Sequence, residues 1–150
     1  MKSELDRRRE KEKHSGFIAV DWDGTTVEYH GWEAWNKFGK PIPAMVERIR
    51  GWLREGYTVK IMTARLPRSQ KRNHKVTCWQ TGKTYTRGEM EDAISAHCEK
   101  IIGTRLEAIN VKCTGMIELW DDRVIQVEPN TGRSLAEVHA AELSALKGAP

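Results

Sequence analysis

Two carboxylates stand two residues apart, Asp21 and Asp23, between the apolar run at residues 17–20 and the pair Gly24-Thr25. A run of four or five apolar residues is typical of a buried strand. The two acids are therefore expected where that strand opens into a loop, which is where α/β sheets usually carry their chemistry. One aspartate there can be a turn residue or a helix cap. Two of them followed by Gly-Thr indicate a chemical role.

Further polar residues stand at the ends of other apolar runs. They are Thr63 and Arg65 with the run 57–63, Lys112 after residues 109–111, and Asp121 with Asp122 after residues 116–120. The carboxyl ends of neighbouring parallel strands converge on one crevice, so these side chains are expected to meet the two acids that follow residue 20. The sequence therefore predicts a crevice with several acids, one lysine, one threonine and one arginine.

Acids gathered this densely have a definite chemical use. At ~4 Å and an effective dielectric of roughly 20, each pair of carboxylates repels by about 4 kcal/mol. A divalent cation that prefers hard oxygen ligands, such as Mg²⁺, removes that repulsion. One aspartate then attacks phosphorus to form an aspartyl phosphate, while a second protonates the leaving oxygen. The hydroxyl of Thr63 and the ammonium of Lys112 suit the phosphoryl oxygens.

The segments between these positions predict the elements that hold them. Helices are expected over residues 43–56, 89–102 and 134–146, and a further strand over residues 124–127. Residues 26–40 are expected to form an ordered loop or a short helical lid. The alternation of strands and helices predicts an α/β fold: a doubly wound (Rossmann-like), mostly parallel sheet with helices on both faces and a small hairpin insertion.

The chain as a whole has the composition of one globular domain. Its 150 residues suffice for one core, so residues 16–150 are expected to form a single domain after a charged, flexible tail at residues 1–15. No apolar stretch approaches the ~20 residues of a membrane span, and the charged first residues do not resemble a secretory signal. Cys78, Cys98 and Cys113 lack CxxC spacing and favour a reducing, cytoplasmic setting.

A strongly basic segment lies between residues 65 and 88. It contains seven basic and no acidic residues, namely Arg65, Arg68, Lys71, Arg72, Lys75, Lys83 and Arg87. Their field attracts anions, although a solvated basic loop gives the same pattern. The segment also predicts a hairpin around Gly82 in which Trp79 and Tyr85 face each other. Trp32 and Trp35 either stack on a base or pack within the fold.

In type and order, the candidate residues resemble the haloacid dehalogenase (HAD) superfamily of phosphohydrolases. The four motifs of the family are matched by Asp21-x-Asp23-Gly24-Thr25, by IMT ending at Thr63, by Lys112 in NVKCTG, and by Asp121-Asp122 in ELWDD. The resemblance runs from about residue 17 to about residue 127. The second and third motifs are weak alone, whereas four motifs in this order are a strong signal.

The resemblance implies a role for each matched position. Asp21 would be the nucleophile and a Mg²⁺ ligand, and Asp23 the general acid and base with its backbone carbonyl on the metal. Thr63 and Lys112 would hold the phosphate. Asp122 would be the third protein ligand of the metal, with Asp121 beside it as an alternative ligand. The substrate would also contact Gly24, Thr25, Ala64 and Arg65.

The resemblance also bears on the substrate. HAD phosphatases carry cap domains after the first motif or between the second and third, and both segments are short here, which implies an uncapped or minimally capped enzyme. Thr63-Ala64-Arg65 resembles the second motif of polynucleotide 3′-phosphatases, so a nucleic-acid 3′-phosphate end is one expected substrate. A nucleotide or another small phosphate ester fits as well. Two other hypotheses stay open: a catalytically weak nucleic-acid-binding protein on this fold, and phosphoryl transfer to an acceptor other than water.

Overall fold

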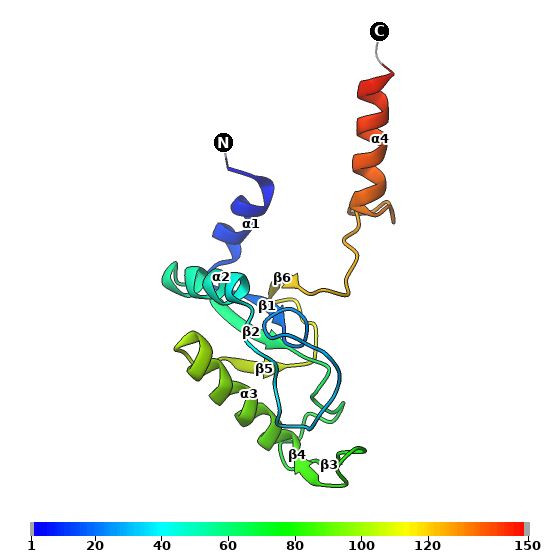
Figure 1. Cartoon of the computed structure of the whole chain (residues 1–150). Helices are drawn as coiled ribbons and strands as arrows, with labels where there is room; N and C mark the ends of the chain where they lie inside the picture. Colours follow the sequence, from blue (N-terminus) through cyan, green and yellow to red (C-terminus); the bar gives the residue numbers. More distant parts are fainter. Residues whose placement is uncertain (1, 149–150) are drawn as a thin grey trace.

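The computed structural model describes residues 2–148 and contains a four-stranded sheet with strand order β5-β2-β1-β6 (Figure 1). The strands are β1 (Phe17–Asp21), β2 (Thr58–Met62), β5 (Glu107–Ile109) and β6 (Met116–Trp120). Every neighbouring pair in this sheet is parallel. The expected α/β fold with a mostly parallel sheet is confirmed.

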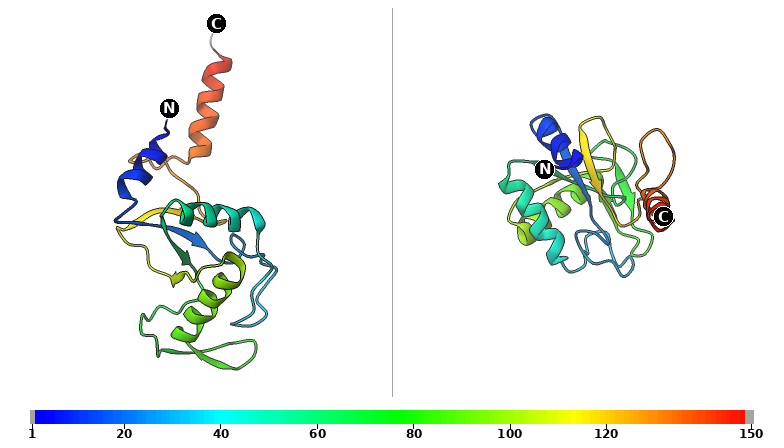
Figure 2. Two further views of the ribbon diagram at one scale, coloured as in Figure 1. Left: turned by 90° about the vertical axis from the view of Figure 1, so that its left-hand side faces the viewer. Right: turned by 90° about the horizontal axis from the view of Figure 1, so that it is seen from above.

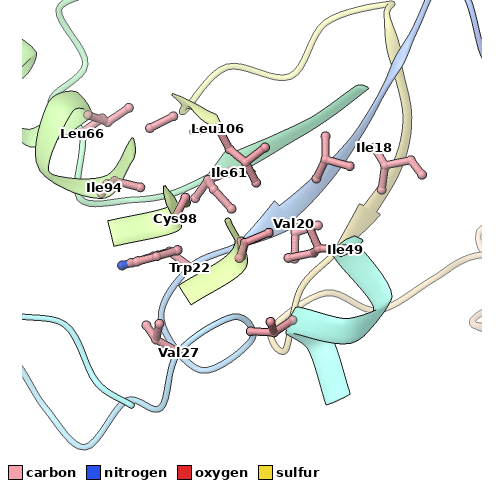
Figure 3. Packing of buried hydrophobic residues seen from close by; sticks show 14 of the residues in the cluster. Ile18, Val20, Trp22, Val27, Ile49, Ile61, Leu66, Ile94, Cys98 and Leu106 are labelled. Atoms are coloured by element: carbon pink, nitrogen blue, oxygen red, sulfur yellow. The ribbon is translucent and has the colours of Figure 1, made fainter. Parts of the chain in front are cut away.

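One face of the sheet carries two helices, α2 (Pro43–Arg54) and α3 (Arg87–Ile102). Ile49 of α2 and Ile94 of α3 join the same core as Ile18 and Val20 of β1 (Figure 3). All four side chains are fully buried, and burial of one such side chain contributes about 1.5–3 kcal/mol. This core fixes β1, whose last residue is Asp21.

The other face of the sheet carries a smaller cluster built from strand residues alone. Phe17, Ala19 and Met116 are buried in it, and Met62, Ile109 and Leu119 are partly exposed. The link from β5 to β6 has six residues, whereas a crossover that includes a helix needs about ten or more. The helices on both faces that a doubly wound sheet requires are therefore not confirmed.

The order of the strands reverses beside β1. From β1 the chain proceeds to β2 and then β5 on one side, and it returns to place β6 on the other side of β1. Such a reversal opens a crevice at the carboxyl ends of the two strands that flank it. Since β1 ends at Asp21 and β6 ends at Trp120, the crevice opens beside the aspartates.

A separate hairpin precedes α3 and is formed by β3 (Lys75–Thr77) and β4 (Thr84–Thr86), as expected. The expected contact between Trp79 and Tyr85 is wrong. Tyr85 pairs with Val76 across the hairpin and stacks on Trp35, with ring centroids 4.9 Å apart. Six residues connect the two strands, so Trp79 lies beyond the paired positions and is 79% exposed.

A short helix, α1 (Glu4–Glu12), lies within the segment expected to be a charged tail. It begins with a capping box formed by Ser3 and Asp6. Arg9 forms an ion pair with Glu118 of β6 and lies over the ring of Trp52. These contacts attach the N-terminal helix to the domain.

The C-terminal helix α4 (Leu135–Lys147) begins at the expected capping box of Ser134 and Glu137. It has no buried residue and stands away from the sheet (Figures 1 and 2). The strand expected at residues 124–127 is wrong. Only a single bridge between Val127 and Ser134 forms there, and Ile125 is 79% exposed. An apolar run forms a strand only where a neighbouring strand accepts its hydrogen bonds.

Candidate active site

A cavity of about 620 Å³ lies at the carboxyl ends of the sheet strands. Its lining includes Asp21 and Asp23 after β1, Thr63 and Arg65 after β2, and Asp121 after β6. Ala64 lines it as well. The structure thus brings together polar residues from three strands that are far apart in the chain, which is the convergence expected at a reversal of strand order.

Three carboxylates form a compact group at the edge of this cavity. Oxygens of Asp21, Asp121 and Asp122 all lie within 4.8 Å of one another. Within residues 2–148, none of the three carboxylates has a salt-bridge partner. Hard oxygen donors that lack a cationic side chain suit a divalent metal ion. The group includes both members of the Asp121-Asp122 pair.

The crowding of these carboxylates alters the acidity of Asp21. Burial, followed by the nearby charge of Asp121, raises the pKa of Asp21 to about 7. Hydrogen bonds from the Trp22 N–H and the Thr25 hydroxyl act in the opposite direction and are outweighed. Burial and a neighbouring carboxylate thus both disfavour the charged form of Asp21.

The Gly24-Thr25 pair joins the two sides of the carboxylate group. The Thr25 hydroxyl lies 3.3 Å from a carboxylate oxygen of Asp21 and 3.3 Å from one of Asp122, and it accepts the backbone N–H of Asp122 at 3.1 Å. Gly24 has φ 86°, and a Cβ there would lie 2.8 Å from Oδ2 of Asp122. Glycine is therefore needed for the close approach of Asp122 to the loop after β1.

Asp23 lies outside the carboxylate group and is paired with Arg65. The two nitrogens Nε and Nη2 of Arg65 donate to the two oxygens of Asp23 at 2.6 and 2.7 Å. The side chain of Arg65 is only 5% exposed. A paired, doubly hydrogen-bonded contact of this kind fixes both the position and the orientation of the carboxylate.

Aromatic rings hold Arg65 in place. The guanidinium lies 4.5 Å from the ring centroid of Trp32 and 5.0 Å from that of Phe38. It also donates to the backbone carbonyls of Ala34 and Trp35 at 3.4 and 3.3 Å. Stacking of a cation on ring faces is favourable and stronger when the pair is buried. Loop 26–40 is thereby fastened over Asp23, and Trp32 and Trp35 pack within the fold.

Thr63 offers an unused donor to the cavity. Its side chain is 3% exposed, and its oxygen accepts the backbone N–H of Arg65 at 3.1 Å. The hydroxyl hydrogen finds no acceptor among the described residues, so it is available to an anion bound in the cavity. Thr63 follows Met62, the residue that pairs with Asp21 in the sheet, so it lies beside the end of β1.

Lys112 does not line the cavity; it lies exposed in the link between β5 and β6. The sequence expectation put a strand at residues 109–111, but β5 ends at Ile109. Asn110 therefore occupies the position after the strand and lines the cavity. Its amide donates to the carbonyls of Leu66 and Pro67 at 3.2 and 3.0 Å.

Four cavity-lining residues were missed by reasoning from the sequence, namely Tyr29, Met62, Asn110 and Arg123. Arg123 directly follows the acidic pair, so its position after β6 was a usable signal. Tyr29 lies on a loop without periodicity, where no sequence pattern indicates which side chains turn inward.

No family model matches this chain, and neither a curated protein nor a solved structure matches it. No helix in residues 2–148 combines the length and the apolar character that crossing a membrane requires. The chemistry of the site is accordingly argued from the residues of this chain.

Proposed function

We propose that the protein is a Mg²⁺-dependent phosphohydrolase of the HAD type that cleaves a phosphate monoester through an aspartyl phosphate on Asp21. The observation that carries this proposal is the group of Asp21, Asp121 and Asp122, whose oxygens lie within 4.8 Å of one another beside a cavity that Thr63 also lines. Nucleophile, metal ligands and a phosphate-binding hydroxyl are the parts that this reaction needs.

The donor set fits Mg²⁺. All three side chains offer carboxylate oxygens, which are the ligands that this ion prefers. A bound Mg²⁺ supplies positive charge that offsets the repulsion between the carboxylates and a phosphate. Burial, followed by the charge of Asp121, raises the pKa of Asp21 to about 7, and a nearby cation would favour its charged form.

The residues of the chain then divide the reaction between them. A carboxylate oxygen of Asp21 attacks phosphorus, the bond from phosphorus to the leaving oxygen breaks, and that oxygen takes a proton from Asp23. A water then attacks the phosphorus of the aspartyl phosphate as Asp23 takes back a proton, and inorganic phosphate leaves Asp21. Arg65 positions Asp23 through the paired hydrogen bonds, one of which must open when the carboxyl of Asp23 carries the proton that it donates.

The phosphoryl oxygens need donors of their own. Thr63 supplies the hydroxyl that has no acceptor in the described chain. Lys112 is the cation that the HAD resemblance assigns to this task, and Arg123 is a cation that lines the cavity. We propose that Gly24, Thr25 and Ala64 contribute backbone and side-chain contacts around the phosphate.

The size of the site supports a leaving group larger than a simple alcohol. The cavity of about 620 Å³ includes the ring of Tyr29 in its lining, and a flat ring suits a nucleobase. A nucleotide and the 3′-phosphate end of a nucleic acid both meet this description. We propose these two as the substrate class.

The test is turnover of p-nitrophenyl phosphate by the full-length protein and by Asp21→Asn. We expect the wild type to require Mg²⁺, to stop in EDTA and to recover on added Mg²⁺, and Asp21→Asn to be inactive with an unchanged melting profile. Asp92→Asn, an exposed aspartate on α3, is the matched control and should be fully active. Undiminished hydrolysis by Asp21→Asn would falsify the mechanism.

One rival function draws on a different observation. An exposed tryptophan and two exposed lysines, Lys75 and Lys83, on the hairpin suit a nucleic-acid-binding protein with little catalysis. That function predicts salt-sensitive oligonucleotide binding with no phosphate release from a broad panel of phosphate esters. Phosphate release from any member of the panel would exclude it.

A further inference from the structure

The basic residues between 65 and 88 fall into two groups once the ion pairs are assigned. Arg65 pairs with Asp23, Arg87 pairs with Glu91, and Arg72 contacts Glu91 and Asp92. The other four, Arg68, Lys71, Lys75 and Lys83, are exposed and form no ion pair within residues 2–148. The remaining positive charge is therefore concentrated on the β3–β4 hairpin and the loop that leads to it.

Trp79 is the second unusual feature of this hairpin. It is 79% exposed, whereas the other five tryptophans are buried or half-buried. Lys75 on β3 and Lys83 before β4 flank it in the chain. A large flat ring exposed between cations matches the way in which proteins hold single-stranded nucleic acid, by stacking on bases and pairing with phosphates.

Two hairpin residues, one on either side of Trp79 in the chain, are buried and hydrogen-bonded or stacked, whereas Trp79 itself is exposed. Cys78 is buried, its N–H donates to the carbonyl of Lys83 at 2.8 Å, and its own carbonyl accepts the N–H of Gly82 at 2.8 Å. Tyr85 is buried against Trp35. The exposed ring is thus presented by an ordered turn, which lowers the entropy cost of binding.

The same contacts attach the hairpin to the wall of the active-site cavity. Tyr85 of β4 stacks on Trp35 of loop 26–40, and Trp32 of that loop lines the cavity. The hairpin and this loop lie side by side in the ribbon (Figure 1). Arg68 and Lys71 are on the segment that runs from the cavity residue Arg65 towards the hairpin. Basic residues are therefore spaced along the segment that connects the cavity residue Arg65 to Trp79.

We propose that the β3–β4 hairpin binds single-stranded nucleic acid, with one base stacked on Trp79 and the phosphates paired with Arg68, Lys71, Lys75 and Lys83. The proposal rests on the proposed function in one respect, since it makes the end of a single strand the substrate that enters the cavity. A single strand is favoured over a duplex because only unpaired, splayed bases present a face to a side chain.

Binding is measured by the fluorescence anisotropy of a labelled oligothymidylate of about 12 nucleotides, a length within the usual range for one binding site. EDTA is present so that no turnover occurs. Trp79→Ala should weaken binding about tenfold, in line with the loss of one base stack, and Trp79→Phe should retain most of the affinity. Leu146→Ala, which alters another strongly exposed apolar residue on α4, is the matched control and should bind as the wild type does.

The role of the cations is measured by the dependence of log K on log salt. Lys75→Ala/Lys83→Ala should reduce the slope by about 1.4, because each phosphate contact to a single strand contributes ~0.7. Lys11→Ala/Lys147→Ala removes two charges from the terminal helices and should leave the slope unchanged. An unchanged slope in the hairpin variant would overturn the assignment of these cations.

Two results would overturn the proposal as a whole: no binding of the oligonucleotide, or equal affinity of Trp79→Ala and wild type for it. Equal binding of a duplex, with no effect of Trp79→Ala, would show attraction of polyanions only and would also overturn it. Hydrolysis of p-nitrophenyl phosphate distinguishes a failure of this nucleic-acid proposal from a failure of the proposed phosphatase function. That activity should be the same in Trp79→Ala and wild type, whatever the oligonucleotide does.

Discussion

Asp21 and Asp23 are the same residue type two positions apart, and the fold gives them opposite electrostatic surroundings. Asp21 lies beside Asp121 and Asp122, and its pKa is raised to about 7. Asp23 faces the guanidinium of Arg65 at 2.6 and 2.7 Å. One carboxylate lacks a positive charge, and the other has one built into the fold.

The difference shows how one short loop can supply two carboxylates with different chemical roles. Trp22, which stands between them in the chain and is fully buried in the core, anchors the loop. Gly24 then turns the backbone so that Asp122 reaches the loop. Identical side chains acquire different tasks when their environments separate their charges. Under the proposed function, Asp21 binds a metal ion, whereas Asp23 is held in position by Arg65.

The largest effect expected from this contrast concerns the leaving group. Asp23→Asn removes the proton donor and should lower kcat/KM about 10²–10⁴-fold for an alkyl phosphate such as a nucleoside 3′-phosphate. The loss should be smaller for p-nitrophenyl phosphate, because p-nitrophenolate leaves without a proton. Asp21→Asn should remove both activities alike. Equal losses of the two substrates in Asp23→Asn would contradict the assignment of Asp23 as the acid.

The ion pair itself is tested through stability. Arg65→Met leaves Asp23 without its partner in a partly buried site and should destabilise the fold by about 3–5 kcal/mol, the usual cost of breaking a buried pair. Arg133→Met breaks an exposed pair with Glu128 and should cost about 1 kcal/mol or less. Both losses in the free energy of unfolding are to be measured by urea denaturation in EDTA.

The double variant Asp23→Asn/Arg65→Met decides whether the two side chains act as a pair. We expect its loss of stability to be clearly smaller than the sum of the two single losses, because each single variant leaves a group unpaired. Additive losses would mean that Arg65 stabilises the loop through its contacts with Trp32 and Phe38 rather than through Asp23.

The pH dependence of stability should report on Asp21 when metal is absent. Its pKa is about 7 in the folded protein against an ordinary value of 3.8, so the folded state binds this proton more tightly than the unfolded chain does. The free energy of unfolding therefore falls as the pH rises from about 4 to about 7. In EDTA the melting temperature should be higher at pH 5.5 than at pH 8, and Asp21→Asn should reduce this difference. Added Mg²⁺ should raise the melting temperature most at pH 8.

The positions of Asp21, Thr63 and Asp121 at one crevice could be predicted from the sequence because each stands at the end of a short apolar run that forms a strand of the sheet. The pairing of Asp23 with Arg65 could not be predicted, since it depends on how loop 26–40 folds over both residues. The end of β5 was misjudged by two residues, and for that reason Asn110 rather than Lys112 lines the cavity. Residues 124–127 have the composition of a strand but no neighbouring strand to pair with.

The smallest expected effect concerns Thr25, whose hydroxyl contacts the carboxylates of Asp21 and Asp122. Thr25→Val removes the hydroxyl that lies 3.3 Å from both Asp21 and Asp122 and that accepts the N–H of Asp122. Supporting hydrogen bonds of this kind typically change metal affinity about tenfold or more. The Mg²⁺ concentration for half-maximal activity should rise about tenfold in Thr25→Val, while Thr25→Ser, which keeps the hydroxyl, should stay near the wild type. An equal rise in both variants would place the effect in the packing of the methyl group, and the contrast between Asp21 and Asp23 would then owe nothing to Thr25.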